Sequence, residues 1–134
     1  MGNAFAMASL PPKSQRTYST EEQWTGEYWI DGKKIYRKTI VQNIESSSLQ
    51  IDTNNLDAEI MWIDEQSSFV KMVLPNKSVT VFLPVNGFAR DNYTTYMEIL
   101  KRSAGNIINC FVGSELLANK LTVYCTLRYT KTTE

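Results

Sequence analysis

The sequence predicts an all-β fold, an antiparallel β-sandwich of jelly-roll type, because its apolar residues alternate and its turn residues are regularly spaced. Residues 121–129 alternate between apolar and polar side chains, and residues 79–85 repeat the alternation. A period of two is typical of a strand with one buried face. The segments 58–62, 70–74 and 108–112 contain β-branched, aromatic or other apolar residues at alternate positions, so each is predicted to form a further strand.

Residues typical of turns lie between these predicted strands. Asp31 and Gly32 stand between two apolar runs, a pattern that predicts a two-residue β-hairpin. Proline, asparagine and glycine mark further reversals near residues 75–78, 86–88 and 104–106. The run 114–118 fits a single helical turn.

One segment has the spacing of a helix instead. Its apolar residues recur at intervals of three and four, at Tyr93, Tyr96, Met97 and Leu100. Asp91 or Asn92 provides an N-cap, and Gly105 provides a stop. Periodicity alone therefore predicts a helix over residues 93–103.

The composition is that of one globular domain, since 134 residues are enough for a core without metals or disulfides. Fourteen Lys and Arg residues balance fourteen Asp and Glu residues, which argues against nucleic-acid binding through a basic surface. No apolar run is long enough to span a bilayer, so no membrane insertion is expected. The N-terminus lacks the basic and apolar segments of an export signal.

Histidine is absent from the sequence. Its absence removes the commonest general base and the commonest metal ligand, together with Ser-His and Cys-His nucleophile pairs. No EF-hand loop, CxxC pair or HExxH motif occurs, so we expect no enzyme activity, no catalytic residues, no cofactor and no metal site. Cys110 and Cys125 lie on the apolar faces of predicted strands and are expected to be reduced and buried.

The first residues differ in character from the rest. Pro11-Pro12 interrupts regular structure, and the residues that follow are polar. Residues 1–17 are therefore predicted to form an arm that anchors the chain and takes no part in the fold. Apolar content rises from Tyr18 onward, and residues 18–134 are predicted to form the β-sandwich domain.

Aromatic side chains are the best candidates for binding. The chain has three Trp, seven Tyr and five Phe residues, more than one small core needs, so some are expected to face a partner subunit or a sugar ring. The alternative, that all of them lie in the core, stays open. The adjacent acids Glu21-Glu22 and Asp64-Glu65 point to opposite faces of a strand and are interpreted as solvated charges.

The two ends of the domain resemble a known family. Three motifs resemble the start of the C-terminal domain of many bacteriophage tail-fibre and receptor-binding proteins. They are residues 18–23 (YSTEEQ), 29–33 (WIDGK) and 35–40 (IYRKTI). Its usual ending resembles residues 126–134 (TLRYTKTTE), and two inner elements are similar to 85–90 (VNGFAR) and 112–115 (VGSE). The resemblance covers residues 18–134 in matching order, and it implies a strand at Met97–Lys101 in place of the helix.

The resemblance also implies a function. It indicates a homotrimeric virion protein of a phage tail, fibre or capsid surface, made in the bacterial cytoplasm, with residues 1–17 bound to other virion proteins. The domain would attach to a polysaccharide of the host surface. The segments that resemble the family least, residues 52–68 and 86–96, are the predicted binding site. They contain Trp62, Asp64, Arg90, Asp91, Asn92, Tyr93 and Tyr96.

Two alternatives to host attachment remain. The first is a capsid or tail decoration or adaptor protein that binds only other virion proteins. The second is an enzyme that cleaves surface polysaccharide, which would need two carboxylates facing one groove and for which no motif occurs.

Overall fold

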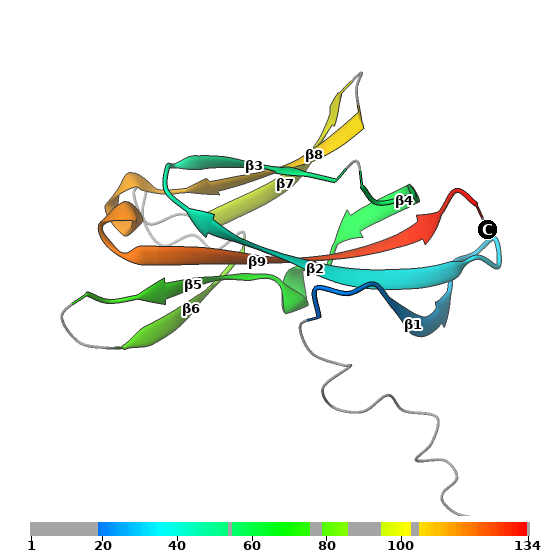
Figure 1. Cartoon of the computed structure of the whole chain (residues 1–134), viewed down its shortest axis with the longest axis horizontal. Coiled ribbons are helices and arrows are strands. Elements are labelled where there is room, and N and C mark those ends of the chain that lie inside the picture. Colours follow the sequence, from blue (N-terminus) through cyan, green and yellow to red (C-terminus); the bar gives the residue numbers. More distant parts are fainter. Residues whose placement is uncertain (1–18, 54, 76–78, 86–94, 103–104, 134) are drawn as a thin grey trace, which may run out of the picture.

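Strand β9 (Lys120–Lys131) organises the larger of two antiparallel sheets (Figure 1). The computed structural model describes residues 19–53, 55–75, 79–85, 95–102 and 105–133. The strands of the larger sheet follow the order β1 (Gln23–Tyr28), β2 (Lys34–Ile44), β9, β5 (Phe69–Val73) and β6 (Thr80–Pro84), and β4 (Ala58–Ile63) also pairs with β9. The smaller sheet has the order β3 (Ser48–Asp52), β8 (Gly105–Val112) and β7 (Thr95–Arg102).

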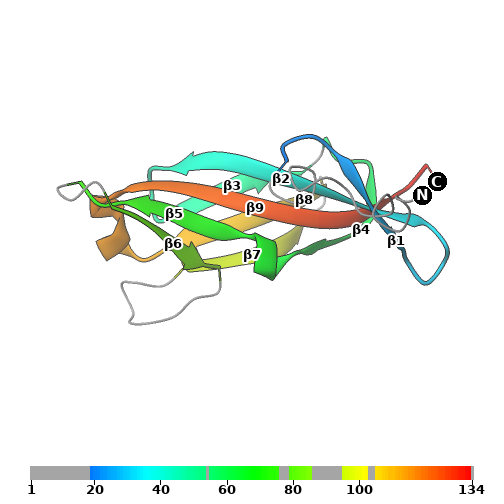
Figure 2. The same ribbon diagram turned by 90° about the horizontal axis from the view of Figure 1, so that it is seen from below.

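The smaller sheet covers one face of the larger sheet, as the turned view in Figure 2 shows. Apolar side chains from both sheets meet between them. Ile51, Val70, Ile108, Val123 and Leu127 are completely buried there. Burying a side chain of this size contributes about 1.5–3 kcal/mol to stability. One shared core therefore joins the sheets, and the predicted antiparallel β-sandwich is confirmed.

Strands β8 and β9 have the alternation that the sequence predicts. The odd-numbered residues from Leu121 to Tyr129 point into the core, as do the even-numbered residues from Ile108 to Val112. Cys110 and Cys125 belong to these rows and are buried, unbonded thiols, as expected. Burial raises the pKa of Cys110 to about 11, and burial together with Cys110 raises that of Cys125 to about 12.

Two strands in succession pair with one edge of β9. Strand β4 pairs with its C-terminal half and β5 with its N-terminal half, and η1 (Glu65–Ser67) lies between them. Ser68 bridges the change of strand. Its Oγ accepts the backbone N–H of Thr126 (2.9 Å) and donates to the carbonyl of Asp64 (2.8 Å). Strand β9 thus keeps its hydrogen-bond partners where its neighbour changes.

The predicted hairpin joins β1 to β2, but its loop is longer than two residues. The N–H of Gly32 donates to the carbonyl of Trp29 (2.9 Å), and the N–H of Trp29 donates to the carbonyl of Lys33 (2.8 Å). Gly32 has a φ of +89°, the left-handed conformation that closes a three-residue hairpin loop. The two-residue prediction is wrong because Ile30, which is 94% exposed, belongs to the loop and not to the strand.

Residues 95–102 form strand β7, so the helix predicted from periodicity over residues 93–103 is wrong. Met97 lies opposite Cys110 of β8 and points into the core, whereas Tyr96 lies opposite Phe111 on the outer face. The helical spacing therefore combines side chains from both faces of a strand. Pairing with β8 and burial of Met97 stabilise the strand more than the helical spacing of the apolar residues favours a helix. The strand implied by the family resemblance at Met97–Lys101 is confirmed.

The remaining expectations concern the helical turn and the arm. Residues Ser114–Ala118 form the short 3-10 helix η3, as predicted. The arm, residues 1–17, lies outside the described residues. No helix in the described part of the chain has the length and apolar character needed to cross a membrane.

Candidate binding surfaces

The predicted site residues lie on two opposite faces. Trp62 and Asp64 belong to β4 and the turn after it, on the outer side of the larger sheet. Tyr96 lies on the outer face of the smaller sheet. Because the core separates the two faces, the structure does not bring these residues together. The other predicted site residues, Arg90, Asp91, Asn92 and Tyr93, lie outside the described residues.

Trp62 and Asp64 belong to a cluster that holds the β1–β2 hairpin against the sheet. Trp62 packs against Trp29, with ring centroids 5.3 Å apart. Beside them Arg128 donates from Nε to Asp64 Oδ2 (3.0 Å) and from Nη1 to Glu27 Oε1 (2.7 Å). We call these five residues the tryptophan cluster. The Asp64 side chain is only 13% exposed, so its carboxylate primarily holds the turn after β4 against β9.

Four residues from the motifs at the two ends of the domain meet at one end of the larger sheet. Glu22 accepts a hydrogen bond from Tyr129 Oη (2.5 Å) and pairs with Lys131 Nζ (2.5 Å). Lys131 also lies over the ring of Tyr36, with Nζ 4.3 Å from its centroid. We call these four residues the terminal latch. It joins two motifs from opposite ends of the domain, so the motifs have a structural explanation that needs no ligand.

The latch shifts the pKa values of two of its groups in opposite directions. Partial burial would raise the pKa of Glu22, but hydrogen bonds from Lys131 and Tyr129, with the charges of Lys131 and Lys38, hold it below its ordinary value of 4.5. Burial, and then the hydrogen bond to Glu22, raises the pKa of Tyr129 far above that of a free tyrosine. Tyr129 therefore keeps its proton and Glu22 its charge at neutral pH, and neither is tuned for proton transfer.

The outer face of the smaller sheet carries an exposed aromatic pair. Tyr96 and Phe111 lie opposite one another in the register and are 41% and 40% exposed. Polar groups surround them: Tyr96 Oη donates to Glu98 (2.8 Å), and Ser48 Oγ donates to Asn109 Oδ1 (3.2 Å). We call these five residues the small-sheet patch. Ring surface beside hydroxyl, amide and carboxylate groups suits a ligand that is apolar on one face and polar at its rim.

The outer face of the larger sheet carries a different aromatic surface. Phe69 packs edge-on against Phe82 and stacks on Tyr124, with ring centroids 4.9 and 4.7 Å apart. Val41 lies opposite Tyr124, so the row crosses β6, β5, β9 and β2. Phe82 is 61% exposed. We call these four residues the aromatic row, and its continuous apolar surface suits a protein partner.

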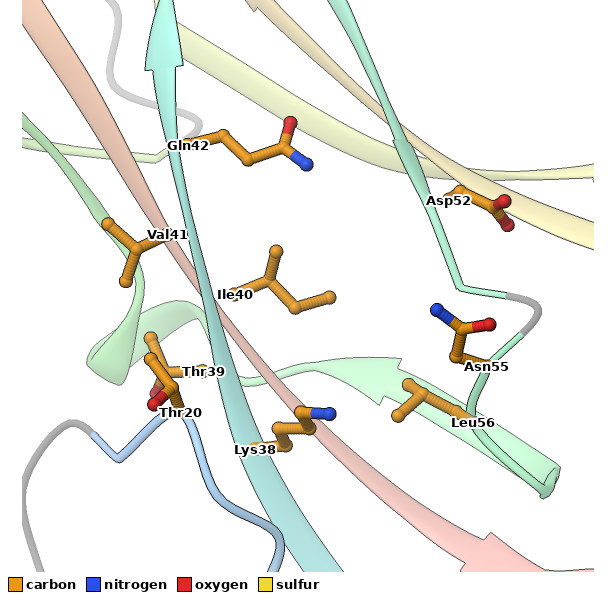
Figure 3. Close-up of a pocket in the computed structure, with 9 residues that line it drawn as sticks. All are labelled: Thr20, Lys38, Thr39, Ile40, Val41, Gln42, Asp52, Asn55 and Leu56. Carbon is orange, nitrogen blue, oxygen red and sulfur yellow. The ribbon is translucent and has the colours of Figure 1, made fainter.

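A groove of about 330 Å³ lies between β2 and the chain that follows β3 (Figure 3). Lys38, Ile40 and Gln42 point from β2 toward the segment that carries Asn55 and Leu56, whereas the exposed Asp52 lines the rim and points away from β2. Ile40 and Leu56 form its apolar floor against the core. Asp52 is the one carboxylate among the described residues that line it. A pair of carboxylates, as acid–base cleavage of a polysaccharide needs, is not present among these described lining residues.

Four residues of the small-sheet patch, Ser48, Glu98, Asn109 and Phe111, are not among the site residues predicted from the sequence. A signal for Phe111 was present, because it alternates with the apolar residues Cys110 and Val112 and so must face outward from their strand. Nothing in the sequence indicated that Phe111 would lie opposite Tyr96. That neighbourhood depends on the pairing of β7 with β8.

Comparisons with known proteins add no relative, since no family model, curated protein or solved structure matches the chain. Within the described ranges, no three Cys, Asp or Glu side chains are grouped so that they could hold a metal ion. The candidate function therefore depends on the exposed surfaces and on the motifs at the two ends of the domain.

Proposed function

We propose that this chain is the binding domain of a bacteriophage tail or fibre protein, which attaches to a host-surface glycan through the small-sheet patch. The motifs at residues 18–40 and 126–134 support the phage assignment. The observation that carries the glycan assignment is the exposed Tyr96–Phe111 pair with polar groups on the same sheet face.

The chemistry of the small-sheet patch supports a sugar as ligand. The C–H face of a sugar ring packs on an aromatic ring, and its hydroxyls bond to amide, hydroxyl and carboxylate groups at the edge. Asn109, Ser48 and Glu98 supply such groups. Because all five residues lie on paired strands, little ordering is needed when the ligand binds. Arg90, Asp91, Asn92 and Tyr93 precede Tyr96 closely in sequence and stay candidates for the same site.

The proposal includes a homotrimer attached to other virion proteins through residues 1–17. One shallow site binds weakly, and three copies on one particle raise the effective affinity by avidity. Static light scattering at micromolar concentration is expected to give three times the mass of one chain. A monomer mass would contradict this part of the proposal.

The aromatic row favours a second candidate, a capsid or tail decoration or adaptor protein that binds only other virion proteins. A row of stacked rings with a 61% exposed phenylalanine at its end resembles the apolar centre of a protein interface more than a sugar site. The two candidates use different faces, so they make different predictions.

A glycan array and a host-cell binding assay distinguish them. Tyr96→Ala and Phe111→Ala are each expected to weaken binding roughly two- to tenfold, since an aromatic contact contributes about 0.5–1.5 kcal/mol. Phe82→Ala is the matched control, because it removes a more exposed ring from the opposite face and should leave glycan binding unchanged. Absence of any glycan binding, with a virion complex that Phe82→Ala disrupts, would favour the adaptor.

A further inference from the structure

Beyond the end of β1, one edge of β2 is unpaired within the described part of the chain. Strand β1 pairs with β2 only as far as Arg37, and the N–H of Thr39 donates to the carbonyl of Ser19 (2.8 Å) just upstream of β1. From Ile40 to Ile44 no described segment pairs with this edge, although β9 pairs with the opposite edge throughout. An open edge of this kind exposes backbone donors and acceptors that accept a further strand.

We propose that residues 13–18 of the same chain bind this edge as an added antiparallel strand, and that only residues 1–12 extend as the arm. The hydrogen bond between Thr39 and Ser19 sets the direction and the register. Continued from Ser19, antiparallel pairing places Thr17 opposite Val41 and Gln15 opposite Asn43.

The length of this segment matches the length of the open edge. Strand β2 ends at Ile44, and the same register reaches Ile44 at Ser14 and the following residue, Glu45, at Lys13. Pro11-Pro12 lies directly before Lys13 in the sequence, and its backbone nitrogens carry no hydrogen to donate. The chain thus loses its ability to pair at the position where the edge ends.

The side chains of the segment match the surface beside the edge. Opposite residues of paired strands share a face. In this register Tyr18 falls on the face of Ile40, over the apolar floor of the groove in Figure 3. Arg16 falls beside Gln42, on the same face. The segment is basic and contains no acid, and Lys13 falls opposite Glu45.

The added strand changes where the arm leaves the domain. The exit moves from Thr39 to the end of β2, about 17 Å further along the sheet. This differs from the expectation that all of residues 1–17 stay outside the fold, and it leaves residues 1–12 as the part of the arm that can bind other virion proteins. The inference does not depend on the proposed function, because it concerns only how the chain completes its own sheet.

Amide hydrogen exchange on the full-length protein tests the added strand. The N–H groups of Val41 and Asn43 are expected to exchange at least roughly tenfold more slowly than exposed amides. Gln15→Pro and Thr17→Pro should remove this protection, because the N–H of each faces β2 in the proposed register. Ser14→Pro is the matched control, since its N–H faces away and an edge strand tolerates proline there.

Three outcomes would overturn the proposal. The first is exchange of Val41 and Asn43 at the rate of exposed amides in the unmodified protein. The second is protection that disappears on dilution, which would mean that a second copy supplies the strand. The third is equal loss of protection in Ser14→Pro and Gln15→Pro, which would exclude the register.

Discussion

The terminal latch and the small-sheet patch both contain aromatic and charged side chains, but they use them differently. In the latch Tyr129 has no exposed surface, and its hydroxyl bonds to Glu22 across the fold. In the patch Tyr96 and Phe111 are about 40% exposed, and Tyr96 bonds only to Glu98, two residues away. The buried Tyr129 stabilises the fold, whereas the exposed rings and polar groups of the patch can exchange their present partners for a ligand.

This contrast affects what the family resemblance indicates about the fold and about the ligand. The motifs at the two ends of the domain supply all four residues of the latch, Glu22, Tyr36, Tyr129 and Lys131. The small-sheet patch belongs to segments outside those motifs. A resemblance of this kind therefore indicates the fold more directly than it indicates the ligand.

The largest expected difference between the two regions is in stability. Tyr129→Ala is expected to lower the free energy of unfolding by about 3–5 kcal/mol, because it leaves a large cavity in the core. Tyr96→Ala should change it by no more than about 0.5 kcal/mol, as is usual for an exposed site. Urea denaturation of both variants measures this. Equal losses would mean that the small-sheet patch is as structural as the latch.

Removing only the hydroxyl groups gives a smaller effect of the same sign. Tyr129→Phe is expected to cost about 1.5–3 kcal/mol, because a buried phenol loses its hydrogen bond to a charged carboxylate. Tyr96→Phe is the matched control and should be neutral in unfolding. If Tyr129→Phe is also neutral, the latch depends on ring packing and not on the bond to Glu22.

The latch also predicts a dependence on pH. The pKa of Glu22 is lower in the folded chain than its ordinary value of 4.5, so its charged form stabilises the fold above that pH. This contribution is lost as the pH falls through the lowered pKa. Glu22→Gln should therefore flatten part of the decline in stability below pH 4.5, measured by thermal unfolding across the acid range. An unchanged acid slope in Glu22→Gln would contradict this role.

The smallest expected difference is between the two thiols. Cys110 belongs to the smaller sheet and Cys125 to the larger one, and both are buried with raised pKa values. A thiol reagent should label neither in the native protein and both after unfolding. If the sandwich opens as one unit, the two should react at similar rates. Much faster labelling of Cys110 would show that the smaller sheet opens alone.

Taken by itself, the sequence determined the fold class, the inward-facing residues of β8 and β9, and the burial of both cysteines. These features are local, because a period of two assigns each side chain to one face of a strand whatever its neighbours are. The same logic failed at residues 95–102, where helical and strand spacing overlap, and at the hairpin, where Ile30 lies in the loop.

Only the tertiary structure decided which strands are neighbours. It separated Trp62 and Asp64 from Tyr96, placed Phe111 opposite Tyr96, and joined Glu22 to Tyr129. Contacts of this kind join segments as much as 107 residues apart, which no local pattern encodes. A binding surface built from the outward positions of two or three strands therefore emerges only when their register is known.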